Sequence, residues 1–171
     1  MKTRIYAFFA TVIVMVVFSA NASGQASATA TATATIVTPI SITTDANMNF
    51  GNIAVSAAPG TVVLTPAGGR TPTGGVTLPA VGGTVSAAVF TVAGTPAYTY
   101  AITLPAAATT VTSGANTMTV DTFTSTPAGT GTLDGTGSQA LQVGATLNVA
   151  ANQPSGTYVS GTPFTVTVNY N

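Results

Sequence analysis

Few side chains in this sequence could take part in chemistry. The chain has three acidic residues, Asp45, Asp121 and Asp134, and it contains no histidine, cysteine or glutamate. A serine nucleophile needs a neighbouring base, a zinc site needs Cys or His, and a glycosidase needs a pair of carboxylates. Because the three Asp residues lie in widely separated segments, we expect no enzymatic activity, no catalytic residue and no cofactor.

One stretch has the spacing of a metal loop. Asp45-Ala46-Asn47-Met48-Asn49 resembles the start of a calcium-binding loop, but its glycine, Gly51, falls one place late and no acidic residue closes the loop. A single carboxylate is a poor charge count for Ca²⁺. We therefore expect no metal here, and an Asx-type turn that leads into a short strand with Phe50 facing inward.

Two residues could contact a ligand. Arg70 could recognise an anion, although a solvated loop charge is its default role, and Tyr158 beside a glycine turn could stack on a carbohydrate. Beyond residue 22, one Arg against three Asp gives a net charge of −2. This balance offers no basic face, so we expect neither nucleic acid nor anionic membrane as a partner.

The N-terminus has the order of a secretory signal peptide. A basic segment, Met1–Arg4, precedes an apolar run, Ile5–Phe18, and Ala20-Asn21-Ala22 forms a small-residue cleavage site. Cleavage after Ala26 is an alternative. We expect residues 1–22 to direct export through the periplasm to the medium or the cell surface. No later segment looks able to span a membrane, and about 145 residues remain to form a core.

The remaining chain has the pattern of strands. Apolar and polar residues alternate with period two in Tyr98–Leu104, Leu141–Val149 and Phe164–Tyr170, no segment has helical periodicity, and Gly and Pro separate the segments. This predicts an all-β antiparallel sandwich of about eight to ten short strands. We expect Phe164–Tyr170 to be a closing strand against which others are laid, and Gly144 to mark a bulge or a close backbone approach.

An alternation of Ala and Thr precedes this domain. It runs from Ala26 to Thr35 and continues into Ile36 and Val37 before Pro39. We expect residues 23–38 to form an extended N-terminal strand or tail, and residues 39–171 to form the sandwich domain. A strand with so shallow a face has a weakly specified register and is a candidate for exchange between molecules. Alternatively, it is the first strand of a complete domain.

Several short motifs resemble one family. They are Ile36–Ile42, Asn49–Ile53, Gly69–Thr71, Val143–Leu147 and the end, Gly156–Tyr158 with Val166–Tyr170. Together they resemble a bacterial secreted family known as domain of unknown function 4402. That family in turn is similar to spore-coat-U and chaperone–usher pilin domains. This likeness implies an incomplete immunoglobulin-like sandwich whose subunits each insert an N-terminal strand into a neighbour.

The resemblance leads to our first functional hypothesis, a structural subunit of a surface filament or layer that assembles by β-strand addition. Its partners would be copies of itself or other surface subunits, with a periplasmic chaperone as a candidate escort. The expected donor positions are Ala28, Ala30, Ala32, Ala34 and Ile36. The expected groove positions are Leu141, Val143, Leu147, Val149, Phe164, Val166, Val168 and Tyr170. The alternative hypothesis is a monomeric binding module or adhesin that recognises carbohydrate or a surface.

Overall fold

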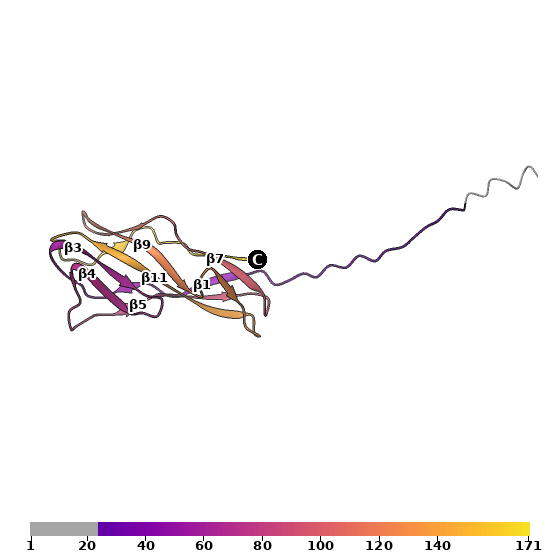
Figure 1. The fold of residues 1–171 in the computed structure, drawn as a ribbon, viewed down its shortest axis with the longest axis horizontal. Helices are drawn as coiled ribbons and strands as arrows, with labels where there is room; N and C mark the ends of the chain where they lie inside the picture. The colour runs from indigo at the N-terminus through magenta and orange to yellow at the C-terminus, as the bar shows by residue number, and fades with distance from the viewer. Residues whose placement is uncertain (1–23) are drawn as a thin grey trace, which may run out of the picture. The chain divides into compact units, whose positions relative to one another are not determined.

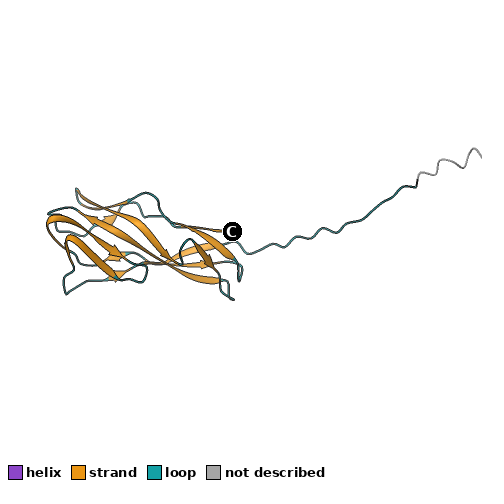
Figure 2. Cartoon of the chain, in the orientation of Figure 1, coloured by secondary structure: helices purple, strands orange, loops and turns teal. Residues whose placement is uncertain are grey.

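The computed structural model describes residues 24–171, so the expected signal peptide lies outside the described residues. The chain divides into two units, of which the first ends at Ile36 and the second is Val37–Asn171. Described by itself, the segment 24–36 has no assigned secondary structure. The second unit is built from strands and loops, and residues 24–171 include no helix (Figure 2). The prediction of an all-β fold is confirmed.

The second unit contains strands of very unequal length. In chain order they are β1 (Ser41–Ala46), β2 (Asn49–Phe50), β3 (Ala54–Leu64), β4 (Arg70–Thr77), β5 (Val85–Ser86), β6 (Ala88–Ala93), β7 (Thr99–Thr103), β8 (Thr109–Ser113), β9 (Asn116–Thr126), β10 (Thr130–Thr132), β11 (Ser138–Val149), β12 (Val159–Ser160) and β13 (Thr167–Tyr170) (Figure 1). Every pairing between them is antiparallel.

The sheets form an immunoglobulin-like sandwich. The large sheet contains the order β1-β6-β11-β9, and a smaller sheet has the order β10-β7-β13. Taken in chain order, these strands match the A-B-E-D sheet and the C-F pair of an immunoglobulin domain. The seventh strand of that fold, G, would pair with the free side of β13. No strand among residues 24–171 occupies that position.

The centre of the large sheet is β11. Along one side it pairs with β6 through Ser138–Val143 and with β3 through Ala145–Val149, and along the other side it pairs with β9. The β9 pairing shifts register between Gly144 and Thr146. At this bulge the backbone φ of Thr122 is +50°, which is rare for a β-branched residue.

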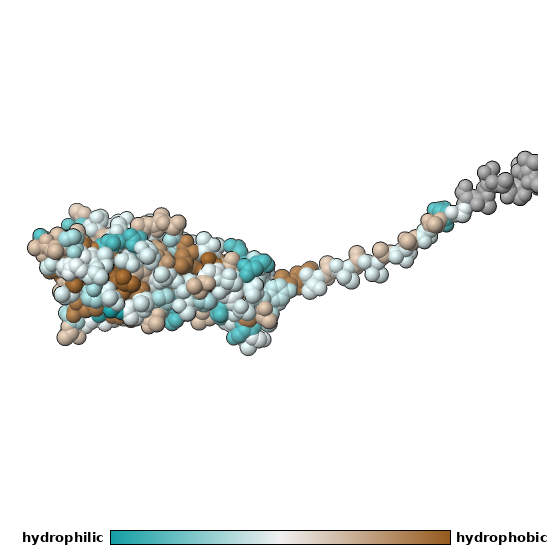
Figure 3. Space-filling model, in the orientation of Figure 1, coloured by the Kyte–Doolittle hydropathy of each residue, from teal (hydrophilic) through white to brown (hydrophobic). Residues whose placement is uncertain are grey.

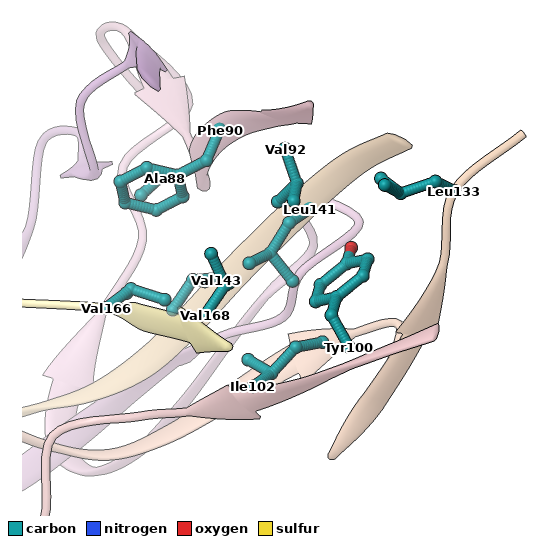
Figure 4. Packing of buried hydrophobic residues seen from close by; sticks show 10 residues of the cluster. All are labelled: Ala88, Phe90, Val92, Tyr100, Ile102, Leu133, Leu141, Val143, Val166 and Val168. Atoms are coloured by element: carbon teal, nitrogen blue, oxygen red, sulfur yellow. The ribbon is translucent and has the colours of Figure 1, made fainter. Parts of the chain in front are cut away.

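Two hydrophobic clusters fill the sandwich. The first lies between the two sheets, where Tyr100 and Ile102 of β7 and Val168 of β13 approach Leu141 and Val143 of β11 (Figure 4). The second joins β11 to the β3–β4 hairpin and β9; its buried members are Val62, Val76, Val120, Ala145, Leu147 and Val149. Phe123, from the bulge in β9, packs against both clusters, so the irregular backbone there serves to connect them.

Two of the sequence-based expectations need correction. Arg70, expected to be a loop charge, begins β4, and the Gly-containing residues after it are also part of this strand, because β3 supplies a continuous partner from Gly60 to Leu64. The last strand is also not an element against which others are laid. Only Thr167–Tyr170 is paired, and its one partner is β7.

Candidate functional site: the open edge of β13

The three carboxylates are dispersed, and each is bound locally. Asp45 accepts a hydrogen bond from the Thr91 hydroxyl (2.7 Å), and Asp121 accepts one from the Asn148 amide (2.9 Å). Asp134 caps its own turn. Among the described residues no three acidic, His or Cys side chains gather as a metal group would require. An Asx turn is present, because Asn49 Oδ1 accepts the Gly51 N–H at 2.8 Å, but it follows the short strand β2 and does not lead into it, and Asp45 belongs to β1.

Arg70 is engaged with the backbone of its own domain. Its Nη1 donates to the carbonyl oxygens of Phe50 (2.6 Å) and Asn52 (3.0 Å), and the side chain is half-buried. Both carbonyls belong to the turn around Gly51. A methyl group on Gly51 would come within 3.0 Å of this guanidinium nitrogen, so the two residues are closely fitted. These contacts give Arg70 a structural role, which is to fasten the β2 turn to the start of β4.

Tyr158 is likewise held from within the chain. Its hydroxyl donates to the Pro154 carbonyl (2.8 Å) and accepts from the Gln153 amide (2.8 Å). Gln153 in turn donates to the Thr117 carbonyl (3.2 Å), which ties this turn to the start of β9. The ring is half-buried. A sugar stacking on Tyr158 would therefore meet a side chain whose hydroxyl is already used.

Strand β13 has a strand partner along one side only. Val168 lies opposite Ile102 and Tyr170 opposite Tyr100, and the Asn171 N–H donates to the Thr99 carbonyl. Because hydrogen-bonded pairs alternate along an antiparallel ladder, the odd-numbered residues of β13 bond β7. The N–H and C=O groups of Val168 and Tyr170 must then point away from it. We call these four groups the open edge of β13.

Half-buried apolar side chains surround the open edge. Ile40 and Ile42, at the start of β1, and Phe164 and Tyr170, at the end of the chain, pack on the first cluster but are not fully covered. Strands β1 and β13 come within 8 Å of each other between Cα atoms without pairing. A strand added to β13 would lie about 4.8 Å from it. The added strand would therefore touch the side chains of β1 and cover part of these half-buried apolar side chains.

Several of the other edge strands are poorly suited to receive a strand. In β4, Pro72 removes a backbone donor, and the pairing with β3 is irregular between Val55 and Gly60. Strand β10 has three residues, and β12 has two. Short or proline-containing edges are devices that block edge-to-edge association. Strand β13, with four residues, contains no proline, and neither does β1, which pairs only with β6 and lies near the open edge of β13.

A hydrogen-bonded latch lies at one end of the open edge. The Tyr170 hydroxyl donates to the Thr38 carbonyl (2.8 Å) and accepts from the Thr95 N–H (2.7 Å). The Thr38 N–H donates to the Thr95 hydroxyl (2.9 Å), so both backbone groups of Thr38 are held. The Tyr170 ring also packs edge-on against Tyr98, with centroids 5.5 Å apart. No sequence pattern indicated Thr38 or Thr95 as partners of Tyr170, since 132 residues separate Thr38 from Tyr170.

The positions expected to line a groove fall into two groups. Leu141, Val143, Leu147 and Val149 belong to β11 and are buried by the chain's own side chains. Phe164, Val166, Val168 and Tyr170 belong to β13 and the segment before it, beside the open edge. The expected donor positions Ala28, Ala30, Ala32 and Ala34 are exposed, and Ile36 is 98% exposed.

A shallow groove of about 490 Å³ lies elsewhere on the second unit, next to β8. Its walls are Pro105, Ala107, Ala108, Thr109, Thr110, Thr112, Gly161, Thr162 and Pro163. The walls carry no charged or aromatic side chain. On the face of the second unit drawn in Figure 3, most of the surface has intermediate hydropathy, with scattered apolar patches. The groove therefore offers little that would select a small ligand.

Comparison with known proteins identifies the family. The family described as Domain of unknown function (DUF4402) matches residues 40–170, and the chain belongs to it. The match covers β1 to β13 and confirms the resemblance noted in the sequence. No curated protein and no solved structure matches the chain. In the described part of the chain, no helix is long and apolar enough to cross a membrane.

Proposed function

We propose that this protein is an exported structural subunit of a bacterial surface filament or layer, and that its copies join by β-strand addition. The observation that carries the proposal is the open edge of β13, where Val168 and Tyr170 present backbone groups with no strand partner among the described residues. Unpaired edges of this kind are templates for an added strand.

The tail has the composition of a suitable donor. Residues 26–36 are extended, alternate Ala with Thr, and end in the exposed side chain of Ile36. Thr favours strands, and alternation gives one apolar and one polar face. The small Ala side chains on the apolar face of the tail suit the open edge of β13, because the core beneath that edge is already largely filled by the domain's own side chains. No charge in residues 24–36 opposes the approach of a second copy.

The remaining features of the proposal rest on the sequence. The signal-like N-terminus supports export to the cell surface or the medium, and the similarity to pilin-like domains supports a subunit role and a periplasmic chaperone. Attachment of the protein to the cell surface would then come from the assembled filament or layer and not from a single subunit. The domain contains no cysteine, so a disulfide cannot contribute to its kinetic stability.

The test is removal of the tail and its replacement by a peptide. A chain lacking residues 26–36 keeps Thr38 and its latch, and we expect it to stay monomeric. We expect the chain that begins at residue 23 to form multimers that persist in detergent unless the sample is boiled. A peptide of residues 26–37 should bind the shortened chain one to one. A peptide of the same composition with the alternation scrambled is the matched control.

Hydrogen exchange gives the position of binding. The bound peptide should protect the amides of Val168 and Tyr170, which point outward, and leave the amide of Asn169, which already bonds β7, unchanged. Detergent-resistant multimers of the shortened chain would contradict the proposal, and so would peptide binding without protection at β13.

A further inference from the structure

The latch at Thr38 bears on which molecule receives the tail. We infer that the Tyr170–Thr38–Thr95 latch prevents the tail from folding back onto the open edge of its own domain, so that the strand is donated to a second copy. This inference rests on the proposed function. It adds a reason why the strand is not used within its own domain, and a positioning role for the Tyr170 hydroxyl.

Folding back would need a tight turn that the residues between the tail and β1 disfavour. The tail enters β1 directly, and Ser41 already pairs with Ala93. To lie beside β1 and β13 of its own domain, the chain must reverse within Val37-Thr38-Pro39-Ile40. Tight two-residue hairpins need positive φ angles and therefore Gly, Asn or Asp, and none is present. A residue before proline, here Thr38, is held to extended conformations.

Both backbone groups of Thr38 are already hydrogen-bonded within the second unit. Its carbonyl accepts from Tyr170 (2.8 Å) and its N–H donates to Thr95 (2.9 Å), and these are the groups a reversing chain would have to release. Thr95 is positioned by the β6–β7 turn, where Gly94 permits close approach: a methyl group on Gly94 would lie 2.2 Å from the Tyr170 hydroxyl oxygen. The turn and the tyrosine are thus fitted to each other around Thr38.

The consequence is an open mode of assembly. If a strand cannot close its own domain and is given to a neighbour, whose own tail goes to a third copy, the contact is head-to-tail and generates a chain of subunits. The even-numbered residues of the donor share an inward face with Val168 and Tyr170. The odd-numbered Thr residues would then lie beside Asn169, on the outer face.

The absence of native cysteine makes this arrangement measurable by engineered disulfides. Cysteine is placed at Asn169 and, in the same chain, at one of Thr29, Thr31, Thr33 or Thr35. Opposed outer-face residues of adjacent strands are within disulfide range, whereas cysteine at Ala30 or Ala32 would face the other side. We expect oxidised multimers for at least one odd-numbered position and little product for the even-numbered controls.

Latch variants separate donation to a second copy from folding back. Tyr170→Phe keeps the ring and its packing on Tyr98 but removes both hydroxyl hydrogen bonds, and Thr95→Ala removes the bonds from the Thr95 side chain. Tyr98→Phe is the matched control, because its hydroxyl makes no hydrogen bond to the described chain. We expect the latch variants to raise the ratio of internally linked monomer to multimer about tenfold, as one or two lost hydrogen bonds allow.

A Gly-Ser insertion between Ile36 and Val37 supplies the positive control. The inserted residues let the tail turn back onto its own domain, which the native sequence prevents. Because a short linker creates millimolar effective concentrations of the tail, internally linked monomer should dominate at about 10 µM protein. Thermal unfolding confirms that each variant is folded.

Each other result has a definite meaning. Internally linked monomers formed by the parent chain alongside linked multimers would overturn the inference while leaving strand addition between copies intact. A ratio unchanged by both Tyr170→Phe and Thr95→Ala would overturn the role of the latch. No cross-link at any position, in either parity, would overturn the inference together with the proposed function.

Discussion

Strands β11 and β13 have the same period-two sequence pattern and opposite positions in the fold. Strand β11 pairs on both sides, with β9 along one and with β6 and β3 along the other, and its apolar residues from Leu141 to Val149 are nearly inaccessible. Strand β13 pairs only with β7, and its Tyr170 is half-buried. Alternation therefore specifies which side chains face a core. It does not specify how many neighbours the backbone has.

Truncation of a core side chain in each strand is the strongest test of this contrast. Leu141 is 0% exposed in β11, so Leu141→Ala should lower the free energy of unfolding by about 2–5 kcal/mol. Val168 is 8% exposed in β13, so Val168→Ala should lower the free energy of unfolding by less, about 1.5 kcal/mol for the loss of two methyl groups. Urea unfolding of the tail-less chain measures both.

The same two variants should differ in assembly. In the full chain, Val168→Ala should weaken detergent-resistant multimers beyond its effect on the monomer, because the added strand would pack against that side chain. Leu141→Ala should weaken multimers only in proportion to monomer stability. Equal losses of monomer stability, with no separate effect on assembly, would show that β13 is as well covered as β11.

A second test concerns backbone approach in β11. A methyl group on Gly144 would lie 2.2 Å from the Leu64 carbonyl oxygen and 2.6 Å from the Thr65 carbonyl carbon, and both are main-chain atoms. Gly144→Ala should therefore destabilise the monomer by about 1–3 kcal/mol, as overpacking does. Gly135→Ala is the matched control, since nothing lies within 4 Å of its added methyl group and its φ is not positive.

Thermal unfolding of the tail-less chain compares the two glycine variants. A Gly144→Ala chain as stable as its parent would mean that β3 and β11 can separate without loss. The tight contact at β11 would then not distinguish it from the edge strand β13.

Much of the fold could be predicted from residue patterns. The alternation in Tyr98–Leu104 and Leu141–Val149 located β7 and β11, and the Gly144 expectation of a close approach is confirmed. Strand β8 was missed because Thr109–Ser113 has one apolar residue, Val111, and gains its place from pairing with β9. The loop expected around residue 70 failed for a related reason: tertiary pairing overrode the weak local preference of Gly and Pro.

The candidate site was only partly accessible to sequence reasoning. Val168 and Tyr170 were assigned to a groove because they alternate, yet nothing local showed that their backbone groups would lack a partner. The latch joins Thr38, Thr95 and Tyr170 from three distant segments. Edges and latches of this kind depend on the order of strands in a sheet, which a single sequence specifies only through long-range packing.

The smallest expected effect concerns the turn that leads into β11. Asp134 Oδ1 accepts hydrogen bonds from the backbone N–H of Ser138 (3.0 Å) and from the hydroxyl (2.7 Å) and N–H (2.8 Å) of Thr136, and these bonds lower the pKa of the Asp134 carboxyl. A carboxyl whose pKa is lower in the folded state contributes stability above its unfolded pKa of about 3.9. That contribution is lost as the pH falls toward the folded pKa.

We therefore expect Asp134→Asn to flatten the dependence of thermal unfolding on pH below about 4 and to change little near pH 7 beyond a small loss. Asp45→Asn is the matched control, because Asp45 accepts one hydroxyl hydrogen bond and lies at the end of β1, away from β11. The slope of the unfolding temperature against pH below about 4 should decrease in the Asp134 variant and not in the Asp45 variant. An equal change in both variants would mean that the charge of the whole domain, and not the turn before β11, governs stability in acid. The Asp134 turn would then give the start of β11 no stabilisation that the end of β13 lacks.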